Sequence, residues 1–456
     1  MRYLGLIIVS KLDAPPVAGL IRWFPKRKGF ASGLAIMGFG AGALLASPLI
    51  RTLMKLHFKF PKSLGACQNQ AVVRDGKHFL EIDGVERPVV IMSGDMKSLG
   101  YSPESTSLIW NPGDCFLVGT GSTGAPQTIL VLGVIYLGVL LISGYCFRPA
   151  PAYDILQDMD NIEEIKVTEE KFSLSYLPSK TFVRSADAFK TFQFYCVWVS
   201  LFLNATAGIA LLGVAKNLIS DVFKEVGRVD EGFCTTYVAI LSLFNGLGRI
   251  FWAAVSDKIG RKSTFSLFFC SGILIYLSIP YFSRNAALNL SLPGFIFVTV
   301  LAITIYGGGF AISPAYLSDL FGTREVGSIY SRLLTAWSAA GLCGPTLLAY
   351  LRRKSEVDSI IHLSELVIDS NSFKSRFGVE SNAIKILIDR NAIDIPTLVD
   401  FLRSKQPATE VNDPTSSLYD TTMYFMSGLL LVGFLNNLLM QPVPSEKWTK
   451  EIDDPV

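Results

Sequence analysis

The chain has 456 residues, of which 50% are hydrophobic and only 17% are charged. A soluble globular protein usually carries about a quarter charged residues, so this composition is typical of a membrane protein. The 41 Lys and Arg residues nearly balance the 38 Asp and Glu residues, which gives no electrostatic reason to expect a nucleic-acid partner.

Eight apolar segments are each long enough to cross a bilayer, which takes about 20 residues with few charges. They are 30–52, 128–147, 191–215, 234–255, 263–283, 293–318, 328–350 and 419–440. A ninth, weaker segment at 1–24 is interrupted by Lys11, Asp13 and the pair Pro15-Pro16. Because a backbone in lipid must satisfy its own polar groups, we expect all of these segments to be helices. The predicted fold class is an all-α membrane protein with about nine crossings.

Lys and Arg residues near the ends of the segments predict their orientation, because cytoplasmic loops are enriched in both. Lys26-Arg27-Lys28, the basic turn at 258–262 and Arg324 all fall on one side of the membrane when the crossings alternate. This side is interpreted as cytoplasmic. Arg51 and the run Arg352-Arg353-Lys354 fall on the other side and argue weakly against it, since each borders a long loop.

Residues 53–127 form a segment that is not membrane-like. The strings Val72–Lys77 and Phe79–Gly84 each contain an Asp-Gly turn signal beside a short alternating run, and this pattern predicts a small β-meander on the extracellular side. Cys67 and Cys115 both fall in this segment. A disulfide between them is one alternative, because spacing alone does not establish the pairing.

Two other segments also lie outside the predicted membrane. Residues 149–189 are rich in Asp and Glu and are interpreted as a cytoplasmic linker between two helix bundles. Residues 351–418 are interpreted as an extracellular insertion with short helices around Ser364–Ile368 and Thr397–Leu402.

Arg249 is the deepest cation in the predicted helices, about two turns from the cytoplasmic end of its segment. A charge within a bilayer is costly and therefore suggests a functional site. Two interpretations stay open. The side chain could extend to the interface, as we expect for Arg332. Alternatively, it faces a polar cavity beside Asn245 and binds a carboxylate through two parallel hydrogen bonds.

Aromatic and small residues in the segments allow similar alternatives. Tyr306, Tyr330 and Trp337 could line a cavity or could be ordinary packing residues, and the last two share a helix face because they are seven residues apart. Gly38 and Gly42 form a small-x-x-x-small pair that predicts close helix packing, which is either static or slides during transport.

The sequence argues against an enzyme. The 3 histidines, His57, His78 and His362, fall in predicted loops, and no Asp or Glu lies deep in a crossing. The predicted crossings therefore lack the His, Asp and Glu side chains that a proton relay or a zinc site would use. It also contains no Ser-His-Asp arrangement at membrane depth and no phosphate-binding glycine loop. We therefore predict no catalytic residues, no metal and no cofactor.

The segment Ala253–Lys262 resembles the loop signature of the major facilitator superfamily, Gly-x-x-x-Asp-x-x-Gly-Arg-Lys, with Ala253 in place of the first Gly. Further strings resemble the oxalate/formate antiporter-like branch, which is related to the monocarboxylate transporters. These strings are Trp23–Gly33, Gly38–Gly42, Gly119–Gly124, Asn204–Gly208, Tyr306–Phe310 and Tyr330–Pro345.

The resemblance implies a register for the whole chain. Residues 1–148 would be a remnant of the N-terminal bundle, helices 4 to 6, with the extracellular loop 53–127. Residues 190–456 would be the C-terminal six-helix bundle that carries the insertion 351–418. About nine of twelve helices would then be present, and helices 1 to 3 would be missing.

The resemblance also implies a substrate site. An Arg on helix 8 and a Lys on helix 11 hold the dianion in the family's oxalate carrier. Arg249 matches the first, whereas Trp337 stands at the second position. Asn245 stands where proton-coupled relatives have an Asp. One cation fits a monocarboxylate better than a dianion, so we expect a small organic anion held by Arg249 and Asn245, in a cavity lined by Trp337, Tyr330 and Tyr306.

Asp257, Gly260, Arg261 and Lys262 would form a cytoplasmic latch that stabilises one access state. The predicted function is a secondary transporter that works by alternating access, with the bilayer and the anion as its partners. The alternative is a non-transporting membrane protein such as a sensor, a scaffold or a truncated pseudo-carrier. We expect the plasma membrane rather than an organelle membrane. Exchange or symport, the anion itself and the oligomeric state stay open.

Overall fold

The computed structural model describes residues 17–66, 72–74, 77–82, 84–91, 114–146, 181–223, 229–286, 288–368, 370–378, 380, 383–389, 393–405 and 412–450. The chain divides into two compact units. One comprises Met1–Leu44 with Pro149–Val456, and the other comprises Leu45–Arg148.

Within the described residues, 8 helical segments are long and apolar enough to cross a membrane. They contain the helices α2 (Lys28–His57), α3 (Ala125–Cys146), α6 (Phe192–Phe223), α7 (Glu231–Ile259), α8 (Arg261–Arg284), α9 (Ser291–Phe321), α10 (Val326–Glu365) and α14 (Asp420–Leu438). These helices confirm the eight clear predicted spans. Of the weaker segment 1–24, residues 17–23 are helical and residues 1–16 lie outside the described part of the chain.

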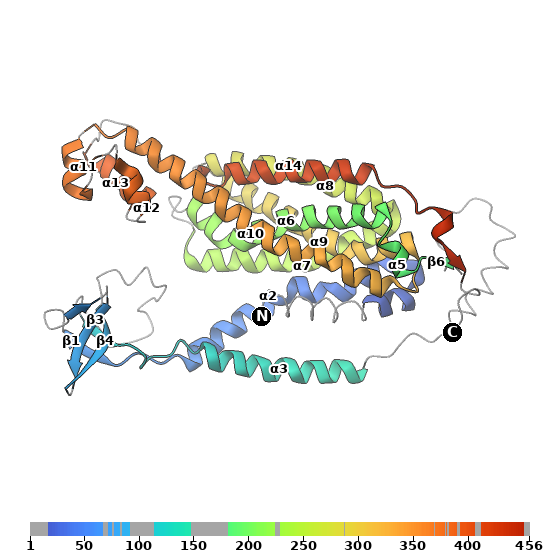
Figure 1. Ribbon diagram of the computed structural model, residues 1–456, viewed down its shortest axis with the longest axis horizontal. Helices are drawn as coiled ribbons and strands as arrows, with labels where there is room; N and C mark the ends of the chain where they lie inside the picture. The colour runs from blue at the N-terminus through green and yellow to red at the C-terminus, as the bar shows by residue number, and fades with distance from the viewer. Residues whose placement is uncertain are drawn as a thin grey trace. The chain divides into compact units, whose positions relative to one another are not determined.

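The first unit is a helix bundle in which α6, α7, α8, α9, α10 and α14 lie side by side (Figure 1). The most buried of these helices is α9, whose neighbours include α6, α7 and α8. Its Gly307-Gly308-Gly309 run permits this close packing. A Cβ added at Gly307 would lie 2.5 Å from the main-chain oxygen of Asn245, and one at Gly309 would lie 2.9 Å from Oδ1 of Asn204.

The part of α2 in this unit packs against α7 through glycine. A Cβ added at Gly33 would lie 2.7 Å from the carbonyl oxygen of Arg249, and one at Gly40 would lie 2.7 Å from Arg249 Nε. Gly38 and Gly42 do not make this contact, since an added Cβ there meets nothing within 4 Å in the structure. Each is two residues, about 200° of helix, from Gly40 and so faces the other way. The predicted packing role of Gly38 and Gly42 lies outside this contact and stays a prediction.

The helix α10 is longer than its apolar segment predicted. It runs without a break for 40 residues, so Ser364 and Glu365 belong to its last turn and not to a separate helix. The chain has no Gly or Pro between Pro345 and Gly378 that would end it earlier. His362 therefore also lies in a helix, as does His57 at the end of α2, although both were predicted in loops.

Three short helices follow α10, namely α11 (Ser370–Phe377), α12 (Ile384–Asp389) and α13 (Ile395–Lys405). The last of them confirms the predicted helix at Thr397–Leu402. Phe373, Leu398 and Phe401 are fully or almost fully buried and pack in one apolar cluster with Ile360 of α10. The insertion therefore has a core that is continuous with the end of α10.

The second unit contains a five-stranded antiparallel sheet in the order β1-β5-β4-β3-β2. Its strands are β1 (Ser63–Ala66), β2 (Val72–Arg74), β3 (Lys77–Ile82), β4 (Val85–Ile91) and β5 (Asp114–Leu117). The consecutive pairing of β2, β3 and β4 confirms the predicted meander. Gly84 has a φ of +74° in the turn before β4. Cys115 is buried and disulfide-bonded, while Cys67 lies outside the described residues.

The remaining elements of the first unit are short. They are η1 (Pro25–Arg27), β6 (Thr181–Phe182), α5 (Ser185–Ala188), η6 (Pro414–Ser417), η7 (Ser445–Lys447) and β7 (Thr449–Lys450). The two strands pair with each other, so the end of the predicted linker contacts the C-terminal segment. Residues 149–180 of that linker lie outside the described part of the chain.

Candidate substrate site and latch

Arg249 lies on α7 with its side chain fully buried, at 0% exposure. Its Nη1 donates to the carbonyl oxygen of Ile36 on α2 at 3.1 Å, and its Nε donates to Oδ1 of Asn245 at 3.4 Å. Gly33 and Gly40 make room for these contacts, because any side chain there would meet α7. The guanidinium therefore points into the packed interior and does not extend to the surface.

Two aromatic rings, the buried Phe310 and the half-exposed Phe39, lie beside the guanidinium. Arg249 Cζ lies 5.2 Å from the ring centroid of Phe39 and 5.0 Å from that of Phe310. The two rings are nearly parallel, at 14°, and Trp337 contacts both edge-on. A cation over each ring face is attracted by the negative π surface, and this attraction grows when water is excluded.

The predicted site residues come together in part. Trp337 Nε1 donates to Tyr306 Oη at 3.3 Å, so Arg249, Asn245, Tyr306 and Trp337 lie in one cluster built from α7, α9 and α10. Tyr330 is buried on α10, two turns and about 10.5 Å along the helix from Trp337. The structure thus does not bring Tyr330 to the guanidinium.

Phe39, Phe310 and the Ile36 carbonyl were not among the predicted site residues. Two of these groups come from α2, which the sequence separates from α7 by about half the chain. One signal could have suggested Phe39, because a large ring between Gly38 and Gly40 is out of place on a face made for close helix packing.

The chemistry of this cluster favours an anion. The contacts to Ile36 and Asn245 are with neutral oxygens, and those to Phe39 and Phe310 are with ring faces. Neutral acceptors compensate a buried cation less well than a carboxylate, which accepts two parallel charge-assisted hydrogen bonds from a guanidinium. A carboxylate is therefore a chemically suitable partner for this guanidinium.

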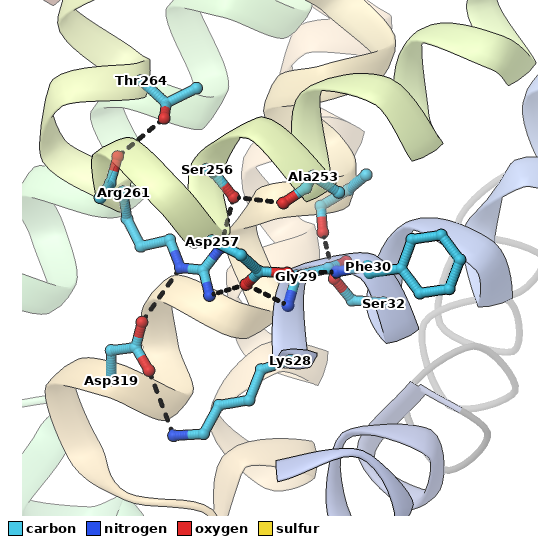
Figure 2. A network of polar contacts seen from close by, with 12 residues as sticks. Lys28, Gly29, Phe30, Ser32, Ala253, Ser256, Asp257, Arg261, Thr264 and Asp319 are labelled. Carbon is cyan, nitrogen blue, oxygen red and sulfur yellow. Dashed lines mark hydrogen bonds and ion pairs between the residues drawn. The ribbon is translucent and has the colours of Figure 1, made fainter. Parts of the chain in front are cut away.

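A second polar site joins the start of α2 to the ends of α7 and α9 (Figure 2). The main-chain N–H groups of Gly29 and Phe30 donate to the two carboxylate oxygens of Asp257, both at 2.9 Å. These groups belong to the first turn of α2, where unpaired N–H groups and the helix dipole favour an anion. Asp257 thus binds the N-terminus of another helix.

Arg261 completes this latch. Its Nη2 lies 2.6 Å from Asp257 Oδ1, its Nε lies 3.0 Å from Asp319 Oδ2, and its Nη1 donates to Ser256. Lys28 Nζ lies 3.2 Å from the other oxygen of Asp319 (Figure 2). The network therefore ties four helices, α2, α7, α8 and α9, together through alternating charges.

The turn between α7 and α8 explains why Asp257 and Arg261 meet. Gly260 has a φ of +87°, a conformation that favours glycine, and it ends one helix and begins the next. Gly29 makes the approach of α2 possible, because an added Cβ would lie 2.5 Å from the Ala253 oxygen and from Arg261 Nη1. Asp257, Gly260 and Arg261 are therefore placed where the signature predicted.

Lys262 is not part of the latch. Its Nζ donates to the carbonyl oxygens of Leu438 at 3.1 Å and Met440 at 2.9 Å. These carbonyls end α14, where a cation compensates unpaired acceptors and the negative end of the helix dipole. Lys262 therefore caps α14 in this conformation, and its predicted gating role stays a prediction.

The partners of the latch on α2 and α9 were missed by the sequence reasoning. Lys28, Gly29 and Phe30 follow Pro25 at the start of a helix, a position with free N–H groups that suits an anion. Asp319 lies near the end of α9. These signals identify a polar helix end but not its partner.

Comparison with known proteins decides the family. The model of the Major Facilitator Superfamily matches residues 117–352, about half of the chain. The chain belongs to this superfamily. It is a multi-pass membrane protein in a family of transporters rather than enzymes, as the signature at Ala253–Lys262 predicted.

The chain is also similar to individual members of the superfamily. It is 24% identical over 325 residues to the oxalate:formate antiporter of Oxalobacter formigenes, covering 71% of this chain and 55% of that protein. It is 24% identical over 337 residues to the apicoplast pyruvate carrier 1 of Toxoplasma gondii, covering 72% and 54%. The predicted branch is therefore confirmed. The chain spans about half the length of these relatives.

Proposed function

We propose that this protein is a secondary transporter that moves a small monocarboxylate across the plasma membrane by alternating access. The observation that carries the proposal is the fully buried guanidinium of Arg249, which donates to the Ile36 carbonyl of α2 and to Asn245 of α7 and lies beside Phe310 of α9. The names of both relatives support the substrate class, since oxalate, formate and pyruvate are small carboxylates.

Binding would replace one set of contacts by another. The carboxylate would take the two donor positions of Arg249 and release the Ile36 carbonyl of α2. Phe39, Phe310 and Trp337 would limit the volume beside the carboxylate. Trp337 replaces the second cation implied by the family resemblance, so this cluster would favour a monoanion over a dianion.

The latch would hold one access state. Asp257 ties the first turn of α2 to α7 on the side proposed to be cytoplasmic, while Arg249 ties the next turns to the same helix. Opening this side requires both ties to break. Because an anion at Arg249 removes one of them, substrate binding would lower the cost of the conformational change.

Uptake into liposomes tests the proposal. Full-length transcript sequencing first defines the chain to reconstitute, and labelled formate, pyruvate and oxalate are then offered separately. We expect uptake of the monoanions, with a loss of at least about 100-fold in Arg249→Ala, because the site's cation is gone. Arg249→Lys should also fail, since an ammonium cannot form the two parallel bonds.

Arg332→Lys is the matched control. Arg332 is exposed on α10, where it contacts Ser328 and stacks on Phe189, so its replacement should leave uptake unchanged. If Arg249→Ala transports as well as the unchanged protein, the anion site is wrong. If the unchanged protein moves none of the anions, a non-transporting membrane protein is the better interpretation.

A further inference from the structure

A group of basic and aromatic residues lies where residues 17–23 join α2, and we name Arg22, Trp23, Phe24, Lys26 and Arg27 the basic corner. Val17 and Ile21 are buried, at 3% and 0% exposure, and hold one face of this helical segment against the bundle. Trp23 and Phe24 are 44% and 51% exposed, and Lys26 and Arg27 are exposed beside them. The corner thus exposes two large rings and two cations within one short stretch of chain.

The cations of the Lys26-Arg27-Lys28 run have different surroundings. Lys28 is in the latch, 3.2 Å from Asp319, with a side chain only 14% exposed. Arg22 donates to the carbonyl oxygen of Arg324 at 2.8 Å and fixes the corner to the bundle. Lys26 and Arg27 extend outward, and among the residues that the structure describes neither makes an ion pair.

This combination matches a membrane interface. Aromatic side chains at a helix end settle at the level of the lipid headgroups, and neighbouring Lys and Arg attract anionic headgroups there. The long stems of Lys26 and Arg27 can reach the phosphate while Trp23 and Phe24 contact the acyl chains. We propose that the basic corner binds the headgroup of an anionic phospholipid.

A lipid bound at the basic corner would also affect the latch, because the corner directly precedes α2. Arg27 lies two residues before Gly29, whose N–H group donates to Asp257. A lipid held by Lys26 and Arg27 would restrain the first turn of α2 and keep its N–H groups on the Asp257 carboxylate. Anionic lipid should therefore stabilise the latch, whereas the lipid site itself does not depend on the protein's being a transporter.

Lipid binding is measured on the purified protein in nanodiscs. Native mass spectrometry counts phosphatidylglycerol retained from mixtures with phosphatidylcholine, and hydrogen exchange follows the peptide that covers residues 22–34. Each cation near an anionic surface is worth about fivefold in affinity, so K26Q/R27Q should weaken phosphatidylglycerol binding by about 25-fold. The same variant should abolish the lipid-dependent protection of the Gly29 and Phe30 amides.

K354Q/K385Q removes the same charge from exposed lysines on α10 and α12 and serves as the control. It should retain both the lipid and the protection. The proposal is overturned if K26Q/R27Q keeps phosphatidylglycerol as the unchanged protein does, or if the control loses it equally. It is also overturned if soluble inorganic phosphate in neutral nanodiscs protects residues 22–34 as well as the lipid does. None of these outcomes depends on anion transport, which is tested separately by uptake.

Discussion

Replacing Asp257 by Asn keeps the shape of the side chain and removes its charge, so it tests the latch without creating a cavity. In the structure Asp257 accepts two main-chain N–H bonds from α2 at 2.9 Å and an ion pair from Arg261 at 2.6 Å. Asn offers one acceptor oxygen in place of two. At least one of the three contacts must therefore be lost, and the others lose their charge.

The magnitude follows from the burial of the pair. The side chains of Arg261 and Asp257 are 9% and 15% exposed, so solvent screens their interaction little. A hydrogen bond to a charged group is worth about 1.5–3 kcal/mol, and breaking a buried pair costs about 3–5 kcal/mol. We take about 3 kcal/mol for the substitution, which changes the equilibrium between closed and open latch by about 150-fold.

Hydrogen exchange measures this change directly. The Gly29 and Phe30 amides donate to Asp257, so their exchange should accelerate by about 150-fold in Asp257→Asn when opening limits it. Asp319→Asn is the control, because Asp319 is 36% exposed and an exposed pair is worth about 0–1 kcal/mol. An equal effect of the two variants, or unchanged exchange in Asp257→Asn, would refute the assignment of the latch to Asp257.

Two further predictions test the contact of Gly40 with α7 and the capping of α14 by Lys262. Gly40→Leu should abolish anion uptake, because its side chain would displace the Arg249 guanidinium and press on the main chain of Gly246. Gly38→Leu, on the opposite face, should transport normally, and equal loss in both would contradict the assigned face. Lys262→Met should lower the melting temperature by about 2 °C through loss of the cap on α14, with Lys258→Met, an exposed lysine, as the control. Accelerated exchange at the latch in Lys262→Met, with no change in melting temperature, would favour its predicted gating role over the cap.

The sequence predicted those features that depend on local chemistry. The crossings follow from apolar length and the meander from its turn residues. Arg249 became a candidate site residue because a buried charge is costly. The Asp257–Arg261 contact is also local, because the two residues are one helical turn apart across Gly260. In each case the residues that decide the outcome are close together in the chain.

The contacts that the sequence did not indicate are with partners that are distant in the chain. Lys262 caps carbonyls 176 and 178 residues away, and no nearby residue indicates this role. Gly38 and Gly42 have the same spacing as Gly29 and Gly33, and only the position of α7 decides which pair is used. The length of α10 was missed for another reason, since leaving the membrane does not end a helix that has no breaking residue.

The pairing of α2 with α7 links the candidate site to the latch. Gly29, Gly33 and Gly40 advance along α2 while their partners Asp257, Ala253 and Gly246 retreat along α7, so the two helices run antiparallel in close contact. Arg249 and Asp257 are eight residues, or about 12 Å, apart on one helix. With glycine at the contacts, α2 lies directly against the main chain of α7 at Ala253, Arg249 and Gly246, which leaves little room for a shift. An anion that displaces the Ile36 carbonyl would therefore act on the same rigid helix pair that Asp257 holds closed.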